Sequence, residues 1–396
     1  MAAVSLAARA AAQEAPLPDG LSWRGGQPVL AAFDGRFFAA PVLQLDLDAG
    51  AFFGQSGPGG FANGTGFRRA RLGLRGKVLD DFEYAFIWHF GGPDPDNWSY
   101  ITEAQITYTG LDRARFRLGA YTPNHLPDYT RDFFDLSFLE RAAVSNVAAS
   151  VASGTTRVAL GLDARGERWV GSAYLTNGVL STRNDGGQRG VVGRAAALLV
   201  DRPGAQLQLG PNGAWRFEAG GVAARFNDYP ELRVDTRRFL DTGALRADSA
   251  YAIGPEANAR VGPLLVEAVW QRIGLDTMDS GARRFDGWYV QGIYPLFGPA
   301  RQRSPRNGAW ARPAVTEPFD PAAGHYGALE IAGRYSTVDL RDGPVRGGRQ
   351  RIWSAAMTWF PRSDLKVTAQ YSNGTVDLDG RDRDFQAVAL RVGLNR

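Results

Sequence analysis

Strand-length runs that alternate apolar and polar residues fill the chain from residue 37 to its last residue. In one such run, Leu329 and Ile331 share one face while Glu330 and Arg334 take the other, because successive side chains on a strand point to opposite sides. A soluble β-sandwich uses this alternation with its polar face in water. A transmembrane barrel inverts it, with the apolar face toward lipid and the polar face toward a water-filled lumen. The pattern therefore predicts an all-β protein and leaves these two architectures to be separated.

The number and length of the runs favour the barrel. We count about sixteen candidate strands, an even number within the range of bacterial outer-membrane barrels. Each is roughly 9–16 residues long, enough to cross a bilayer at a tilt, whereas soluble strands are commonly about 5–6 residues long. The candidate strands are 37–53, 67–78, 82–90, 100–109, 113–121, 155–164, 167–177, 189–200, 214–226, 247–261, 264–274, 284–296, 324–339, 349–360, 364–373 and 383–394.

The connections alternate between short and long, as an up-and-down barrel with short turns on one side requires. The architecture of a β-sandwich does not require short and long connections to alternate in this way. Two connections, 201–213 and 297–323, fall where short turns are expected and are not short. We therefore predict a transmembrane antiparallel up-and-down β-barrel, in which either the strand count fails at these two segments or they fold back into the structure. The tight turns are 78–81, 110–113, 164–167, 262–263 and 360–363, and the long loops are 54–66, 91–99, 122–154, 178–188, 227–246, 275–283, 340–348 and 374–382.

The polar face of several strands carries arginine. On 113–121, Arg115 and Arg117 oppose Phe116 and Leu118, and the strand 67–78 repeats this arrangement. Arginine keeps its charge and offers a planar fork to carboxylate or phosphate groups. In a water-filled lumen such stripes would attract anions and repel cations. The alternative is that they balance lumenal Asp and Glu and hold loops against the wall.

Composition removes other classes of function. The chain has no cysteine, and of its 45 basic residues only Lys77 and Lys366 are lysine. Its three histidines have no metal-ligand spacing, and no phosphate-binding glycine loop, zinc motif or hydrolase elbow appears. We therefore expect no metal and no cofactor. Aromatic side chains face away from the arginines, so they cannot act as stacking platforms, and no nucleic-acid partner is expected.

The N-terminus predicts export. Residues 10–12 form an A-x-A cleavage signal behind a short apolar stretch. We interpret 1–12 as the remnant of a signal peptide, 13–36 as an N-terminal segment, and 37–396 as a single barrel domain. An alanine-rich tail without a targeting role is the alternative.

Several motifs, in order, resemble those of the phosphate-selective porins of the O and P type. They are FRRARLG at 67–73 followed by DFEY at 81–84, RLGAYTP at 117–123, SFLER at 137–141, NG at 177–178, WYVQ at 288–291, the run at 327–336 and WF at 359–360. The resemblance spans residues 33–394. It implies a sixteen-stranded, usually trimeric barrel of the bacterial outer membrane that conducts anions by diffusion. It also implies that the loop 122–154 and the segment 297–323 fold into the lumen.

The resemblance further implies anion contacts by the paired Arg68 and Arg69 and by Arg36 on the first strand. Neighbours on a strand point opposite ways unless a bulge intervenes, so which of the pair faces the lumen stays open. Glu140 and Arg141 are expected to brace the loop. The chain departs from the family in its non-aromatic C-terminus and in lacking a lysine cluster. The predicted pore-lining or anion-binding residues are Arg36, Arg68, Arg69, Arg71, Arg75, Arg113, Arg115, Arg117, Arg131 and Arg334.

These observations predict a passive porin for small anions, phosphate or polyphosphate in particular, rather than an enzyme. The expected partners are these anions, outer-membrane lipid or lipopolysaccharide, and two further copies of the chain in a homotrimer. The alternatives are a general or organic-anion porin and a non-conducting structural barrel. A barrel hydrolase would require His89 or His325 beside a serine.

Overall fold

The computed structural model describes residues 19–24, 27–57, 59–91, 99–180, 187–278, 281–378 and 380–396. The predicted signal remnant at 1–12 lies outside these residues. None of the helices among them is both long enough and apolar enough to span a membrane.

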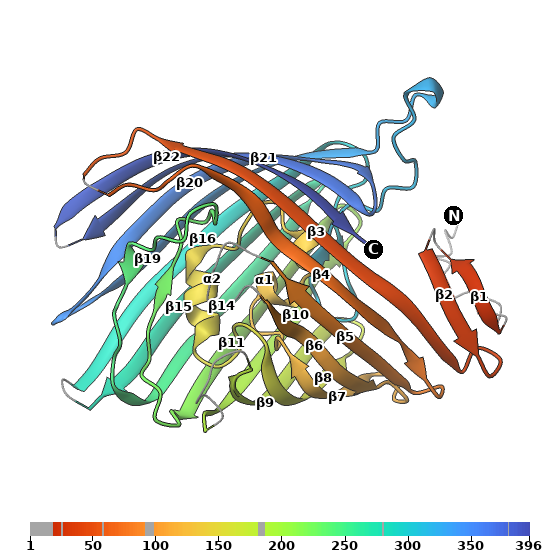
Figure 1. Ribbon diagram of the computed structural model, residues 1–396, viewed down its shortest axis with the longest axis horizontal. Coiled ribbons are helices and arrows are strands. Elements are labelled where there is room, and N and C mark those ends of the chain that lie inside the picture. The colour runs from red at the N-terminus through yellow and green to blue at the C-terminus, as the bar shows by residue number, and fades with distance from the viewer. Residues whose placement is uncertain are drawn as a thin grey trace.

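Sixteen antiparallel strands form a closed barrel, which confirms the predicted fold class (Figure 1). Closure comes from the last strand pairing with the first, since Asn395 stands opposite Gln44 and Gln386 opposite Phe53. A closed barrel leaves no exposed edge of backbone groups in lipid. The strands are β3 (Phe37–Phe53), β4 (Gly64–Val78), β5 (Phe82–Phe90), β6 (Ser99–Tyr108), β7 (Ala114–Tyr121), β8 (Arg157–Arg165), β9 (Trp169–Val179), β10 (Arg189–Arg202), β11 (Ala205–Glu218), β14 (Ala247–Val261), β15 (Leu264–Thr277), β16 (Gly281–Phe297), β19 (Ala328–Asp342), β20 (Val345–Arg362), β21 (Leu365–Leu378) and β22 (Arg381–Asn395).

A short hairpin precedes the barrel. Its strands β1 (Gly20–Arg24) and β2 (Gln27–Ala32) pair with each other, and β2 also pairs with the first residues of β3. The hairpin therefore continues the sheet beyond the point where the barrel closes (Figure 1).

One predicted strand is misplaced. β11 begins at Ala205, directly after a tight turn that includes Gly204 at φ +78°, rather than spanning 214–226. Gly210 and Pro211 suggest a loop, since both are uncommon inside strands, yet both lie within β11. The glycine is needed because a Cβ there would lie 1.9 Å from a carbonyl oxygen of the neighbouring strand. The connection between β10 and β11 is therefore a tight turn, in agreement with the predicted alternation of short and long connections.

Several strands also run further than predicted. β19 and β20 continue to a tight turn at 343–344, and β21 and β22 leave only 379–380 between them. The predicted long loops 340–348 and 374–382 are therefore mostly strand. The segment between β16 and β19 remains long, as predicted, and contains β17 (Gln302–Arg303), β18 (Trp310–Ala311) and the 3-10 helix η2 (Pro321–Ala323).

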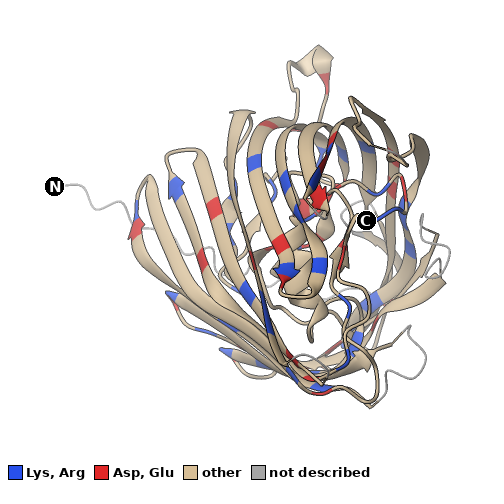
Figure 2. Ribbon diagram, turned by 90° about the vertical axis from the view of Figure 1, so that its left-hand side faces the viewer, with Lys and Arg blue, Asp and Glu red and all other residues tan. Residues whose placement is uncertain are grey.

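Burial alternates along the strands as the pattern predicts. On β3, the polar Asp46 and Asp48 are buried, whereas Leu47 is 47% exposed. On β7, Phe116 and Leu118 face outward with exposed fractions of 46% and 61%. The apolar residues thus form the outer surface and the charged ones line the interior, where Figure 2 shows them on the strands and on the segments inside the barrel.

The loop after β7 fills part of the interior, as predicted for 122–154. It contains α1 (Pro127–Thr130), the 3-10 helix η1 (Phe133–Asp135) and α2 (Ala143–Ser150). The apolar side of α2 packs against the inner face of β14, β15, β16 and β19, where Val144 and Val147 join a buried cluster with Ile273 and Phe285. The main apolar core thus lies inside the barrel, on one side of it.

A second loop also enters the barrel, which the sequence did not predict. Residues 219–246, with β12 (Asn227–Asp228) and β13 (Leu240–Asp241), place Leu232 and Leu240 among buried residues of the wall and of α2. This second loop and α2 therefore fill much of the interior together.

The docking of α2 is testable by Val147→Asp, which would place a charge in a fully buried apolar site. We expect loss of more than about 3 kcal/mol of the free energy that holds the loop, measured by urea unfolding in detergent. Ser150→Asp, at the exposed end of the same helix, is the matched control. Equal stability of the two variants would contradict this packing.

Candidate functional site

A β-bulge turns both paired arginines inward. Asp46 of β3 stands opposite Arg69, but the next residue, Leu47, stands opposite Phe67, so Arg68 is the extra residue of β4. A bulge changes the direction of the side chains that follow it. As a result, the Arg68 Nε lies 2.6 Å and the Arg69 Nη2 3.8 Å from the same carboxylate, that of Glu140. The sequence left open which of Arg68 and Arg69 faces the lumen. In the structure, both side chains face the interior.

The Glu140 carboxylate joins four arginines. Besides Arg68 and Arg69, the Arg391 Nη2 lies 3.0 Å and the Arg233 Nε 3.6 Å from its oxygens. Burial raises the pKa of Glu140, but the surrounding guanidinium groups, Arg68 foremost, hold that pKa well below its usual range. Glu140 is therefore an ionised anchor between loop, wall and second loop, which agrees with its expected role as a brace.

The loop and the wall from β4 to β8 enclose a cavity of about 320 Å³, here called the arginine cavity. Seven arginines and three carboxylates line it, so positive charge is in excess. The arginines are Arg68, Arg69, Arg71, Arg117, Arg131, Arg141 and Arg233, and the carboxylates are Glu103, Asp132 and Glu140.

Five predicted residues, Arg68, Arg69, Arg71, Arg117 and Arg131, border this cavity. They differ in how they are held. Arg131 is wholly buried and pairs with Glu267, its Nη1 donating over 3.0 Å. Arg71 donates from Nη1 to the Gln44 Oε1 over 3.1 Å and has no carboxylate partner among the described residues.

Arg334 lies away from the cavities. Its side chain is 2% exposed, pairs with Glu231 of the second loop and donates from Nη1 to the Glu140 carbonyl oxygen over 3.0 Å. These contacts tie both loops to β19. The arginine is thus placed as a brace, which corrects its predicted position on the pore lining.

Arg36 also lies elsewhere than predicted. It occupies the turn between β2 and β3, not the first strand, and its exposed side chain pairs with Asp80 across 3.2 Å. Strand β2 ends before Arg36 and β3 begins after it, so Arg36 lies in the turn at the rim of the barrel. Its side chain lies outside the cavities.

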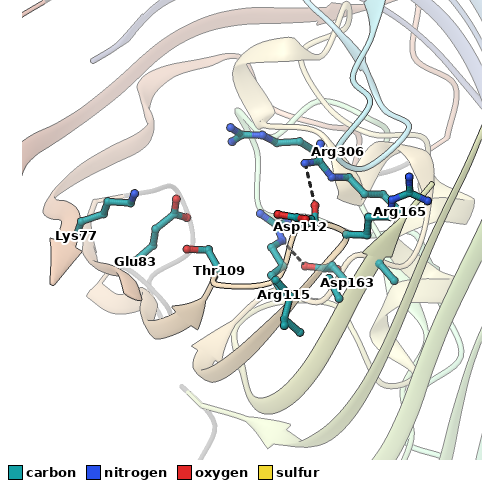
Figure 3. A pocket seen from close by; sticks show the side chains of 12 residues that line it. Lys77, Glu83, Thr109, Asp112, Arg115, Asp163, Arg165 and Arg306 are labelled. Atoms are coloured by element: carbon teal, nitrogen blue, oxygen red, sulfur yellow. Dashed lines mark hydrogen bonds and ion pairs between the residues drawn. The ribbon is translucent and has the colours of Figure 1, made fainter. Parts of the chain in front are cut away.

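The other predicted arginines lie further along the same wall. Arg75 borders a second cavity of about 330 Å³ together with Glu83 and Glu103. Arg113 and Arg115 border a third, of about 360 Å³, at the short turn before β7 (Figure 3). The three cavities are neighbours, because the first two share Glu103 and the last two share Glu83.

Figure 3 shows the third cavity from close by, with Lys77, Arg165 and Arg306 turned toward it. Arg306 comes from the segment between β16 and β19. Within the cavity the Arg115 Nε lies 2.9 Å from the Asp163 Oδ2. Five cationic side chains and three carboxylates, Glu83, Asp112 and Asp163, border this cavity, so positive charge is in excess here too.

Sequence reasoning missed two arginines of the first cavity. Arg141 had been assigned with Glu140 to bracing, although its guanidinium borders the cavity and burial lowers its pKa. Arg233 lies on the second loop, and only the unpredicted entry of that loop into the barrel brings it to Glu140. No local sequence signal marks it.

A buried carboxyl accompanies Arg233. Asp228 accepts a hydrogen bond from the Asn146 Nδ2 of α2 over 2.7 Å and lies 3.8 Å from the Arg233 Nη2. Burial raises the pKa of Asp228 to about 6, against the opposing effect of the Arg233 charge. This carboxyl therefore titrates near neutral pH, close to the arginine cavity.

Neither metal binding nor a serine–histidine site receives support within the described ranges. No group of three metal-ligating side chains occurs there. The histidine that contacts a serine is His125, whose Nδ1 lies 2.9 Å from the Ser153 Oγ, instead of His89 or His325. Both side chains are fully buried, which leaves no room for a substrate beside them.

Known proteins agree with this architecture. The profile of the family described as phosphate-selective porin O and P matches residues 43–395. Porin O of Pseudomonas aeruginosa is 23% identical over 357 residues, which are 81% of this chain and 78% of that protein.

Solved porins share the fold. OmpTdeltaL8, a loop deletion mutant of an outer membrane protein of Vibrio cholerae, superposes with a TM-score of 0.58 at 11% identity, covering 91% of this chain and 100% of that one. The anion-selective porin from Comamonas acidovorans gives 0.54 at 10% identity, covering 90% and 99%. The family match places the protein in the bacterial outer membrane as a porin. The chain belongs to the phosphate-selective porin O and P family.

Proposed function

We propose that the protein is a passive porin for small anions, with phosphate and polyphosphate as its principal solutes. The observation that carries the proposal is the arginine cavity, where seven arginines meet three carboxylates between the in-folded loop and the wall. Positive charge in a narrow, low-dielectric passage raises the local concentration of anions and repels cations. The guanidinium fork also matches the oxygens of phosphate.

The chain of cavities supports passive conduction. Ions must bind well enough to enter and weakly enough to leave, which several weak sites achieve better than one tight site. Glu103 and Glu83 lie between the cationic clusters and interrupt their attraction. The name of one structurally similar protein, an anion-selective porin, and the description of the family as phosphate-selective support the same function.

The rival function is a general or organic-anion porin. It would show the same preference for anions over cations, without tighter interaction with phosphate. Block of chloride current by added phosphate separates the two, because a phosphate-preferring channel loses chloride conductance at phosphate concentrations that leave a general porin unaffected.

Assembly belongs to the same proposal. The resemblance to trimeric porins supports a homotrimer in contact with outer-membrane lipid or lipopolysaccharide. The mass of the unheated protein in mild detergent would be three times that of the chain if this is right, and a monomeric mass would contradict it.

Anion preference is testable by Arg71→Gln combined with Arg117→Gln, two arginines of the cavity that are not fully buried. A unit charge about 4 Å from an ion in water contributes roughly 1 kcal/mol, which corresponds to about a fivefold change in equilibrium. We expect the anion-to-cation permeability ratio to fall by roughly that factor, measured as the reversal potential in a potassium chloride gradient.

The matched control is Arg272→Gln, which removes the same charge from the outer face, where Arg272 pairs with Asp286 and is 45% exposed. It should leave the reversal potential unchanged. A cation-preferring wild-type channel, or no shift in the double variant, would reject the proposal.

The pH dependence follows from Asp228. Its pKa is raised to about 6, so the carboxyl is charged at pH 7 and takes up a proton as the pH falls through 6. Arg233 then loses one of its two compensating carboxylates and keeps Glu140, 3.6 Å from its Nε, while Tyr129 and Tyr229 beside it carry no charge in this range. We expect anion preference to rise between pH 7 and pH 5.

The variant Asp228→Asn should show at pH 7 the selectivity that the wild type reaches at pH 5, with little further change on acidification. Reversal potentials over this pH range provide the measurement. An unaltered pH dependence in the variant would assign the titration to another group.

A further inference from the structure

Three arginines of the cavity surround one aromatic ring of the in-folded loop. The guanidinium carbons of Arg69 and Arg141 each lie 3.8 Å from the centre of the Phe133 ring, and that of Arg71 lies 5.2 Å away. A second ring, Tyr129, lies 3.9 Å from Arg141. Arginine side chains of β4 and of the loop thus converge on Phe133.

Several other buried arginines of the interior are held by carboxylates. Arg194 pairs with Glu256 across 2.7 Å and Arg301 with Glu330 across 2.6 Å, in both cases with side chains that are almost fully buried. A buried pair of this kind fixes the arginine in place but cancels its charge. Such residues brace the barrel and contribute little field to the lumen.

A ring holds a guanidinium differently. The negative face of the ring attracts the cation through its quadrupole, but the ring carries no net charge. Arg71 and Arg141 have no carboxylate partner among the described residues, and Arg141 donates from Nε only to the Asp128 carbonyl oxygen, over 2.8 Å. Their positive charge is therefore kept in place without being neutralised.

Unused donors point to the same conclusion. Arg69 is 1% exposed and its Nη1 donates to the Asp46 Oδ2 over 2.8 Å, but its Nε and Nη2 have no hydrogen-bond acceptor, and neither does the Nε of Arg71. Buried donors without acceptors cost free energy. Contact with the Phe133 ring offsets part of this cost without adding a negative charge.

We propose that Phe133, assisted by Tyr129, is a positioning residue that determines which arginines act on permeating ions. The rings keep Arg71 and Arg141 charged and fixed, whereas carboxylate partners neutralise the bracing arginines. This inference rests on the proposed anion selectivity and deepens it, because it assigns selectivity to two aromatic side chains that carry no charge.

The simpler role for Phe133 is packing, with no influence on selectivity. The two roles differ in what a ring-free residue of similar size does. Phe133→Leu keeps an apolar side chain but removes the quadrupole, whereas Phe133→Tyr and Phe133→Trp retain a ring face. We expect the anion-to-cation permeability ratio of the leucine variant to fall roughly two- to fivefold, and the two aromatic variants to restore it.

Phe138→Leu is the matched control. Phe138 lies on the same loop and its ring centre is 4.2 Å from the guanidinium carbon of Arg334. That arginine is already paired with Glu231, so loss of the ring removes no available charge from the cavity. Its reversal potential should equal that of the wild type. Tyr129→Leu, compared with Tyr129→Phe, provides an independent second pair if the first leucine variant does not fold.

The outcomes separate this inference from the proposed function. If the Arg71 and Arg117 double variant shifts the reversal potential and Phe133→Leu does not, the ring has only a packing role and the inference is overturned, while anion selectivity stands. If the wild type does not prefer anions, the proposed function itself fails. A shift in Phe138→Leu equal to that in Phe133→Leu would also overturn the inference, because it would trace the effect to general loosening of the loop.

Discussion

The interior of this barrel depends on the ion pairs that the Glu140 carboxylate forms with four arginines. Its four arginine partners come from β4, from the closing strand β22 and from the second loop. The same residue offers its carbonyl oxygen to Arg334 of β19. One side chain thus connects both in-folded loops to strands on either side of the barrel seam. Removing one partner of such a buried pair commonly costs about 3–5 kcal/mol, because the remaining charge is left uncompensated.

Charge compensation also distinguishes two sides of the interior, one that is packed and one that contains the cavities. On the side of β14 to β20, apolar residues of α2 and carboxylate-paired arginines fill the space. On the side of β4 to β8, arginines exceed carboxylates and the space stays open. Residue type alone does not distinguish the two groups of arginines. The partner decides, since Arg131 and Arg71 border the same cavity but only the first is neutralised.

The outer wall could be predicted because each strand must place apolar residues toward lipid and polar residues toward water. This requirement is visible in every pair of neighbouring residues. The predicted ranges for β3, β5 and β14 agree with the structure to the residue. The failure at β11 arose where Gly210 allows a close approach of neighbouring backbones, a tertiary requirement that looks like a loop. The interior was harder, because Arg233 reaches Glu140 through contacts between residues far apart in sequence.

Arg68 and Arg69 show how one extra residue in a strand determines the direction of charged side chains. In a regular strand Arg68 would face lipid, where an unpaired charge costs several kcal/mol. The bulge turns it inward, and Glu140 then receives two arginines from adjacent positions. The bulge adds Arg68 to Arg69 and Arg71, so β4 brings three arginines to the arginine cavity. The loop contributes two carboxylates, Asp132 and Glu140, and two arginines, Arg131 and Arg141, so the cavity keeps an excess of positive charge. A rigid, incompletely neutralised cluster of this kind attracts ions without having to rearrange as each one passes.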